Sequence, residues 1–130
     1  MASYRVLYIE DNDDNFRLVQ RILSRYGCEV DRAETAVSGI ETAQNHPYDL
    51  ILTDILLPDC TIQEAHRKLL NPLRQQIGPE LPLVALTAHA FPFDKEFLLT
   101  NGCNFFMAKP INMNEFQSLV SRLLHVEMND

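Results

Sequence analysis

The sequence predicts an α/β fold, a doubly wound, five-stranded parallel sheet with helices on both faces. Short apolar runs alternate with helical patterns, two of these runs end abruptly in carboxylates, and no repeat or low-complexity tract interrupts the alternation. Such alternation requires a parallel sheet covered on both faces, because each right-handed crossover packs its helix against the sheet. With 130 residues, 46% of them hydrophobic, the chain is expected to form one domain over residues 1–130.

The expected strands share an apolar stretch bounded by polar or turn residues, and they cover residues 6–9, 28–33, 49–54, 83–86 and 104–108. The expected helices share apolar residues at helical spacing, and they begin near residues 13, 36, 62, 93 and 112. Asp13 or Asp14 should cap the first helix, and Gly27 should close it. Pro72 should kink or split the third, because proline has no backbone N–H.

Five polar side chains occupy equivalent positions at the carboxyl ends of expected strands: Glu10, Asp11, Asp54, Thr87 and Lys109. In an open α/β sheet the ligand site lies outside these ends, where the strand order reverses. Three neighbouring carboxylates repel one another and need a hard divalent cation, and all-oxygen ligation suits Mg²⁺ better than zinc. A carboxylate beside such an ion can attack a phosphoryl group while a lysine and a hydroxyl stabilise the transition state, so Asp54 is the candidate nucleophile.

Four segments resemble the motifs of response-regulator receiver domains: YIEDN at residues 8–12, LTDILLP at 52–58, LTA at 86–88 and AKPI at 108–111. They follow one another across nearly the whole chain, each at an expected strand end. The resemblance implies a flavodoxin-like (βα)5 fold with strand order 2-1-3-4-5. It also implies a signalling switch of a two-component system or phosphorelay rather than a stand-alone enzyme.

The resemblance assigns a role to each residue of the site. Asp54 accepts a phosphoryl group from a phosphohistidine on a histidine kinase or a histidine phosphotransfer protein. Magnesium is held by Asp11, Asp54 and the backbone carbonyl of Leu56, with Glu10 acting through water. Lys109 pairs with the phosphoryl group.

The resemblance also implies how phosphorylation changes the protein surface. Thr87 donates its hydroxyl to a phosphoryl oxygen and draws its loop inward, and Phe106 occupies the aromatic switch position three residues before Lys109. The changed face, formed by helix four, strand five and helix five, binds a downstream protein target. The Lys109–Pro110 bond is expected to be cis. Whether the domain forms a phosphorylation-dependent dimer stays open.

Two segments depart from the family pattern. After Pro58, the chain has Asp59 and no glycine where the family often has a Met-Asp-Gly-like turn, and Asp59 is expected to cap a helix or form a turn. After strand four, Phe91 and Phe93 place two aromatic side chains on the switch-side loop, where they could form a partner surface.

Other interpretations stay open. Strand-end carboxylates can be solvated without binding a metal, Phe106 can be an ordinary core residue, and His89 can face solvent rather than the phosphoryl pocket. An aspartyl phosphohydrolase would need a second aspartate where Leu56 stands. A receiver-like scaffold that binds partners without phosphorylation, and one module of a hybrid kinase, remain as alternatives.

Composition argues against other classes of function. The formal net charge of −7, with 11 basic residues spread along the chain, disfavours a nucleic-acid surface. No apolar run approaches the roughly 20 residues that span a bilayer, and the first residues lack the apolar core of a signal peptide. The sequence therefore predicts a cytoplasmic protein that acts through other proteins, with any output domain on another chain.

Overall fold

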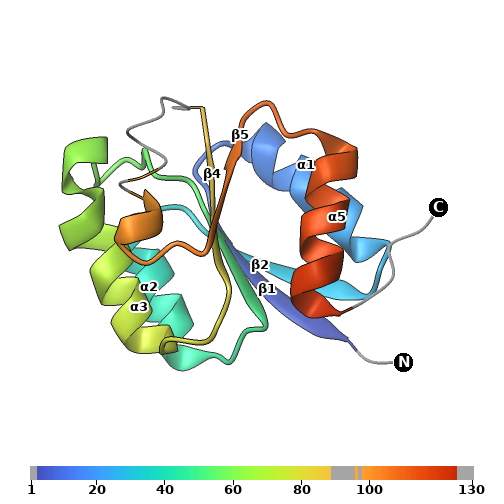
Figure 1. The fold of residues 1–130 in the computed structure, drawn as a ribbon, viewed down its shortest axis with the longest axis horizontal. Coiled ribbons are helices and arrows are strands. Elements are labelled where there is room, and N and C mark those ends of the chain that lie inside the picture. The colour runs from blue at the N-terminus through green and yellow to red at the C-terminus, as the bar shows by residue number, and fades with distance from the viewer. Residues whose placement is uncertain (1–2, 89–95, 97, 126–130) are drawn as a thin grey trace.

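The sheet lies between two layers of helices in the computed structural model, which describes residues 3–88, 96 and 98–125 (Figure 1). Helices α1 (Asp13–Ser24) and α5 (Met113–Leu124) cover one face of the sheet. Helices α2 (Ala36–Asn45) and α3 (Asn71–Ile77) cover the other. This arrangement confirms the doubly wound α/β fold that the alternating pattern predicts.

Five parallel strands form the sheet in the order β2-β1-β3-β4-β5, which confirms the order implied by the resemblance. The strand bounds are β1 (Tyr4–Ile9), β2 (Cys28–Ala33), β3 (Leu50–Thr53), β4 (Leu83–Thr87) and β5 (Phe105–Ala108). The order reverses between β1 and β3. The carboxyl ends of these two central strands are therefore where a ligand site is expected.

Sheet hydrogen bonding continues one residue beyond β1, β3 and β5. The polar residues that follow these strands form what we call the polar edge of the sheet. The first backbone N–H after β1, β3 and β5 donates to a neighbouring strand, in the pairs Glu10–Ala33 (2.8 Å), Asp54–Ile9 (2.9 Å) and Lys109–Thr87 (2.8 Å). These bonds hold the backbone of the polar residues in register with the sheet. Their side chains therefore start from fixed positions.

The third helical segment is divided into three parts. A 3₁₀ turn (η1, Ile62–Glu64) leads into a π-helical segment (η2, His66–Leu70), and α3 follows with Pro72 in its first turn. The N–H of Asn71 donates to the carbonyl of His66, so the helical hydrogen-bond pattern shifts just before Pro72, which has no N–H to donate. The expected split at Pro72 is confirmed, and the π-helical turn before it accommodates the break.

The ends of α1 are fixed by a capping side chain and by a glycine. Asn12, rather than Asp13 or Asp14, caps α1, because its side chain accepts a hydrogen bond from the backbone N–H of Asn15. Gly27 adopts the expected left-handed conformation, with φ of 80°. The start of the expected fourth helix, together with the residues at positions 89, 91 and 93, lies outside the described residues, and residues 98–100 are helical.

Alternate residues of the central strands face opposite helix layers. In β1, Val6 and Tyr8 pack toward α1 and α5, whereas Leu7 and Ile9 pack toward α2 and α3. All four are fully buried. The same alternation places the residue after Ile9 on the side of Tyr8, since residues two apart in a strand share a face.

Gly39 allows α2 to lie close to β1, and its replacement gives a first testable prediction. A Cβ atom at this position would lie 2.5 Å from Cδ1 and 2.8 Å from Cγ1 of the buried Ile9. Overpacking of this kind costs about 1–3 kcal/mol, more than the roughly 1 kcal/mol that alanine gains in helix propensity. We expect Gly39→Ala to lower the free energy of unfolding by on the order of 1 kcal/mol in urea titrations.

A second substitution distinguishes this clash from a general effect of the alanine. Ile9→Val removes Cδ1, the atom closest to the new Cβ, so it should recover part of the loss when combined with Gly39→Ala. In the wild-type background, Ile9→Val should destabilise by about 0.5–1.5 kcal/mol. Strictly additive effects of the two substitutions would show that Ile9 is not what excludes the larger residue.

Candidate functional site

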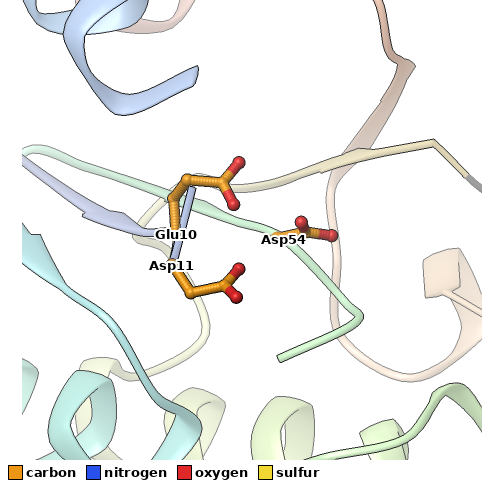
Figure 2. Close-up of side chains that lie close together, drawn as sticks. All are labelled: Glu10, Asp11 and Asp54. Atoms are coloured by element: carbon orange, nitrogen blue, oxygen red, sulfur yellow. The ribbon is translucent and has the colours of Figure 1, made fainter. Parts of the chain in front are cut away.

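Three carboxylates meet at the carboxyl ends of β1 and β3. Glu10 and Asp11 follow β1, Asp54 follows β3, and Figure 2 shows the first two side chains extending toward the side on which Asp54 lies. One oxygen from each carboxylate lies within 4.8 Å of the others. Glu10 and Asp54 are buried, whereas Asp11 is exposed. The site therefore has two buried acids and one acid open to solvent.

Glu10 is held from several sides. Its Oε1 accepts hydrogen bonds from the Tyr8 hydroxyl at 2.9 Å and from the Lys109 ammonium, and its Oε2 accepts from the backbone N–H of Asn12 at 3.3 Å. Burial raises the pKa of Glu10, but these donors outweigh burial and leave the pKa below its ordinary value. Glu10 is therefore ionised at neutral pH although it is fully buried.

Asp54 is fixed by its own loop and by the ammonium group. Its Oδ1 accepts hydrogen bonds from the backbone N–H groups of Ile55 at 2.7 Å and Leu56 at 3.2 Å, and its Oδ2 accepts from Lys109 at 3.0 Å. Burial raises the pKa of Asp54, Lys109 lowers it, and Glu10 raises it again, so the pKa lies above its ordinary value. The negative charge on Asp54 is thus incompletely compensated.

Lys109 is the cation that joins the two buried acids. Burial lowers the pKa of Lys109, but Glu10 and Asp54 raise it more, so the ammonium stays charged. The Lys109–Pro110 peptide bond is cis, as the resemblance implied. The described part of the site holds three clustered carboxylates, and the ammonium pairs with two of them, Glu10 and Asp54, which leaves an excess of negative charge.

The donor set of this site fits a hard divalent cation. The clustered atoms are all carboxylate oxygens, and oxygen ligands are those that Mg²⁺ prefers. Leu56, whose carbonyl is a further expected ligand, lies two residues after Asp54 and is 46% exposed. Exposed Asp11 and Leu56 lie on the solvent side of the site, where an ion could enter.

The two expected switch residues occupy different environments. Thr87 is the last residue of β4 and is 1% exposed, so its hydroxyl lies within the protein at the polar edge. Phe106 is a half-buried residue of β5 that packs against the core on the α2–α3 side. This packing agrees with a core role, and the switch role of Phe106 stays a prediction.

Tyr8 belongs to the site, although the sequence suggested only an apolar strand residue. Its hydroxyl donates to Glu10, and its ring stacks on Phe16 with the ring centres 6.1 Å apart. Burial, followed by the negative charge of Glu10, raises the pKa of Tyr8 and keeps the hydroxyl protonated. The available signal was spacing, because residues two apart in a strand share one face.

Asp59 holds the loop that follows Pro58. Its carboxylate accepts hydrogen bonds from the backbone N–H groups of Ala36 at 2.8 Å and Val37 at 3.1 Å, at the start of α2. Burial raises the pKa of Asp59, but these bonds outweigh it and the pKa is lowered. The capping role expected for Asp59 is confirmed, and the helix that it caps begins 23 residues earlier in the chain.

Comparison with known proteins finds both relatives much longer than this chain and relatives of about the same length. The sensor protein GacS of Pseudomonas syringae pv. syringae is 33% identical over 116 residues, which are 89% of this chain and 13% of GacS. The polar-differentiation response regulator DivK of Brucella ovis is 29% identical over 119 residues, which are 92% of this chain and 94% of DivK. The chain therefore spans only 13% of the length of GacS but nearly all of DivK.

Solved structures show the same fold. The receiver domain of sensor histidine kinase PA1611 from Pseudomonas aeruginosa PAO1, which has a magnesium ion coordinated in its active-site cleft, superposes with a TM-score of 0.80. It is 31% identical, and the match covers 95% of this chain and 99% of that chain. A CheY-like receiver domain protein from Methanospirillum hungatei JF-1 has a TM-score of 0.84 at 25% identity, covering 95% of each chain.

The family model of the response regulator receiver domain matches residues 6–121, a span that contains the acidic cluster, Lys109 and every strand except the first residues of β1. No helix in the described ranges has the length and apolar character needed to cross a membrane. The parallel sheet, the acidic edge and this match lead to one conclusion: the chain belongs to the response regulator receiver domains, the signalling switches of two-component systems.

Proposed function

We propose that Asp54 is the phosphoacceptor of this receiver domain, and that the donor is a phosphohistidine on a histidine kinase or a histidine phosphotransfer protein. One observation carries the proposal: Asp54 is a buried carboxylate that lies 3.0 Å from the Lys109 ammonium and shares a cluster with Glu10 and Asp11. A nucleophile, a fixed cation and oxygen ligands for a metal are the parts that phosphoryl transfer needs.

We assign the metal site to Asp11, Asp54 and the Leu56 carbonyl, with Glu10 acting through water. An indirect role suits Glu10, because its side chain is fully buried whereas Asp11 is exposed to solvent. When bound, Mg²⁺ would supply positive charge to the phosphoryl oxygens during transfer. The magnesium ion in the PA1611 receiver domain supports the choice of metal.

The residues of this chain would orient the groups that react. An oxygen of Asp54 bonds to phosphorus while the P–N bond of the donor breaks, and the electron pair stays on the departing imidazole nitrogen. The N–H groups of Ile55 and Leu56 keep the Asp54 carboxylate from rotating. Lys109 and the Thr87 hydroxyl would hold the phosphoryl oxygens, at the ends of β5 and β4 respectively.

We propose that output occurs by protein binding at the face formed by the fourth helix, β5 and α5. Movement of Thr87 and Phe106 would carry the phosphorylation signal from the polar edge to this face. A hollow of about 420 Å³ between β5 and α5 supports a binding role, and it is lined by Met107, Asn114, Glu115, Ser118, Leu119 and Arg122. The target protein and a phosphorylation-dependent dimer stay predictions.

We propose that residues 1–130 form one receiver domain that contacts neither nucleic acid nor membrane. The match along nearly all of DivK supports a stand-alone regulator, and the match to 13% of GacS supports one module of a hybrid kinase. The cytoplasmic location and the absence of a stand-alone enzymatic activity stay predictions from the sequence. A scaffold that is never phosphorylated is disfavoured, because a complete acidic site would then have no role.

The proposed function can be tested with acetyl phosphate as a small phosphodonor. With magnesium we expect the intact mass to increase by one phosphoryl group, and with a chelator in place of magnesium we expect no increase. Borohydride reduction converts an aspartyl phosphate to homoserine, so peptide sequencing should find homoserine at position 54. Modification elsewhere would show that the nucleophile is misassigned, and no modification by any donor would favour the scaffold.

A further inference from the structure

Arg32 connects the two ends of the loop that carries Asp11. It lies in β2, and its side chain is 23% exposed. Its Nε–H donates to the backbone carbonyl of Glu10 at 3.0 Å, and its Nη1 lies 2.8 Å from the carboxylate of Asp13. Glu10 directly precedes Asp11, and Asp13 begins α1. One planar group therefore holds the residues on both sides of the loop.

The guanidinium of Arg32 is itself held in place. It lies over the ring of Phe16, 5.1 Å from the ring centre, and its Nη2 lies 3.5 Å from the Glu34 carboxylate. The backbone N–H of Glu10 donates to Ala33, the residue after Arg32, at 2.8 Å. Both backbone groups of Glu10 are thus bonded to the end of β2. The guanidinium binds the Glu10 carbonyl through Nε and the Asp13 carboxylate through Nη1. This two-pronged contact, a fork, is more rigid than the single ammonium of a lysine could provide.

A positive charge near a cation site could weaken metal binding, so the charge balance decides the sign. Arg32 faces two carboxylates, Asp13 and Glu34. The Asp13 carboxylate lies 2.8 Å from Nη1 and the Glu34 carboxylate lies 3.5 Å from Nη2, so both acids are within ion-pair distance of the guanidinium. Because these acids offset the guanidinium charge, the repulsion that it exerts on a cation is small. Its effect on the shape of the loop is therefore the larger effect.

We propose that Arg32 is a positioning residue for the divalent cation, which it serves by holding the loop so that Asp11 faces Asp54. The inference rests on the proposed function, which makes these two acids metal ligands. Without Arg32 the loop would sample other conformations, and metal binding would have to order it. Removing an outer partner of a ligand typically weakens metal binding by about 10- to 100-fold.

The test measures Mg²⁺ binding to the unphosphorylated protein by isothermal titration calorimetry. We expect Arg32→Gln to raise the dissociation constant about tenfold. Arg32→Lys keeps the charge but cannot form the fork, so it should also weaken binding several-fold. The control, Arg17→Gln, removes the same charge from an exposed side chain that lies 3.8 Å from Asp14, and should change the constant by less than about twofold.

Further variants separate positioning from folding. Asp13→Asn breaks the ion pair while Asn12 still caps α1, so it should weaken Mg²⁺ binding in the same direction without lowering the melting temperature greatly. If Arg32→Gln fails to fold, the Mg²⁺ dissociation constant of Asp13→Asn tests the proposal in its place. With Mg²⁺ at saturation, the rate of phosphorylation by acetyl phosphate should return to near the wild-type value in Arg32→Lys. A melting temperature of Arg32→Lys near the wild-type value without Mg²⁺ would exclude simple destabilisation, because saturating Mg²⁺ also stabilises the folded state.

Three results would overturn the proposal. Tighter Mg²⁺ binding by Arg32→Gln would mean that charge repulsion dominates. Equal changes in Arg32→Gln and Arg17→Gln would mean that only net charge matters. Unchanged Mg²⁺ binding by Asp11→Asn would show that the metal site itself is misplaced, and this outcome identifies a failure of the proposed function rather than of the Arg32 contact alone.

Discussion

Asp54→Asn is expected to abolish phosphorylation by acetyl phosphate or by a phosphohistidine donor. The amide cannot supply the nucleophilic oxygen, and loss of a covalent nucleophile commonly lowers rates by more than about a thousandfold. Intact mass after incubation with magnesium measures the result directly. A phosphoryl group still gained by Asp54→Asn would place the acceptor at another carboxylate or at a histidine.

The same substitution should not unfold the protein. Burial and Glu10 raise the pKa of Asp54, so the folded state binds a proton at this residue more readily than the unfolded state does. An acid with a raised pKa makes folding less favourable above that pKa, and the penalty is relieved as the pH falls through it. At neutral pH without metal, Asp54→Asn should therefore have a melting temperature equal to or above that of the wild type.

Asp59→Asn is the matched control, with the same chemical change five residues along the chain. Asp59 accepts one backbone hydrogen bond on each carboxylate oxygen at the start of α2. The amide nitrogen of asparagine cannot accept one of them, so the substitution should lower the free energy of unfolding by about 1 kcal/mol. Its phosphorylation should continue, because Asp59 is not among the clustered carboxylates. Asp54→Asn should thus abolish phosphorylation without loss of stability, whereas Asp59→Asn should lose stability and keep phosphorylation.

The positions of Asp54 and Lys109 could be predicted because topology alone brings them together. Each follows an apolar run, and parallel strands with helical crossovers place their carboxyl ends at one edge. This inference needs only the period of the apolar residues and the handedness of the crossovers. Both features can be recognised from the local sequence, so these two positions can be predicted without knowledge of tertiary contacts.

The details that the sequence did not reveal depend on such contacts. Asn12, Asp13 and Asp14 are all suitable helix caps, and Asn12 takes the role while Asp13 pairs with Arg32. The bond from Asp59 to α2 joins segments 23 residues apart, and no local pattern specifies that partner. Tyr8 was hidden for a different reason, since a tyrosine in an apolar run gives no sign of where its hydroxyl points.

Lys109→Met is expected to slow phosphorylation of the folded protein by about a hundredfold or more. Methionine fills a similar volume but cannot stabilise the charge on the phosphoryl oxygens, and losing one fixed donor commonly costs about 10²- to 10³-fold in rate. Lys68→Met is the matched control, because Lys68 pairs with Glu64 at 2.8 Å on the surface, with 40% of its side chain exposed. Equal rates for the two variants would remove Lys109 from the mechanism.

The pKa of Asp54 offers a second measurement of the same contact, with a sign that can be checked in both directions. Lys109 lowers the pKa of Asp54, whereas Glu10 raises it. In metal-free protein, a ¹³C NMR titration of the Asp54 carboxyl should therefore move to higher pH in Lys109→Met and to lower pH in Glu10→Gln. If both substitutions moved it in the same direction, a change in burial rather than in charge would explain the shifts, because desolvation acts on Asp54 whichever neighbour is replaced.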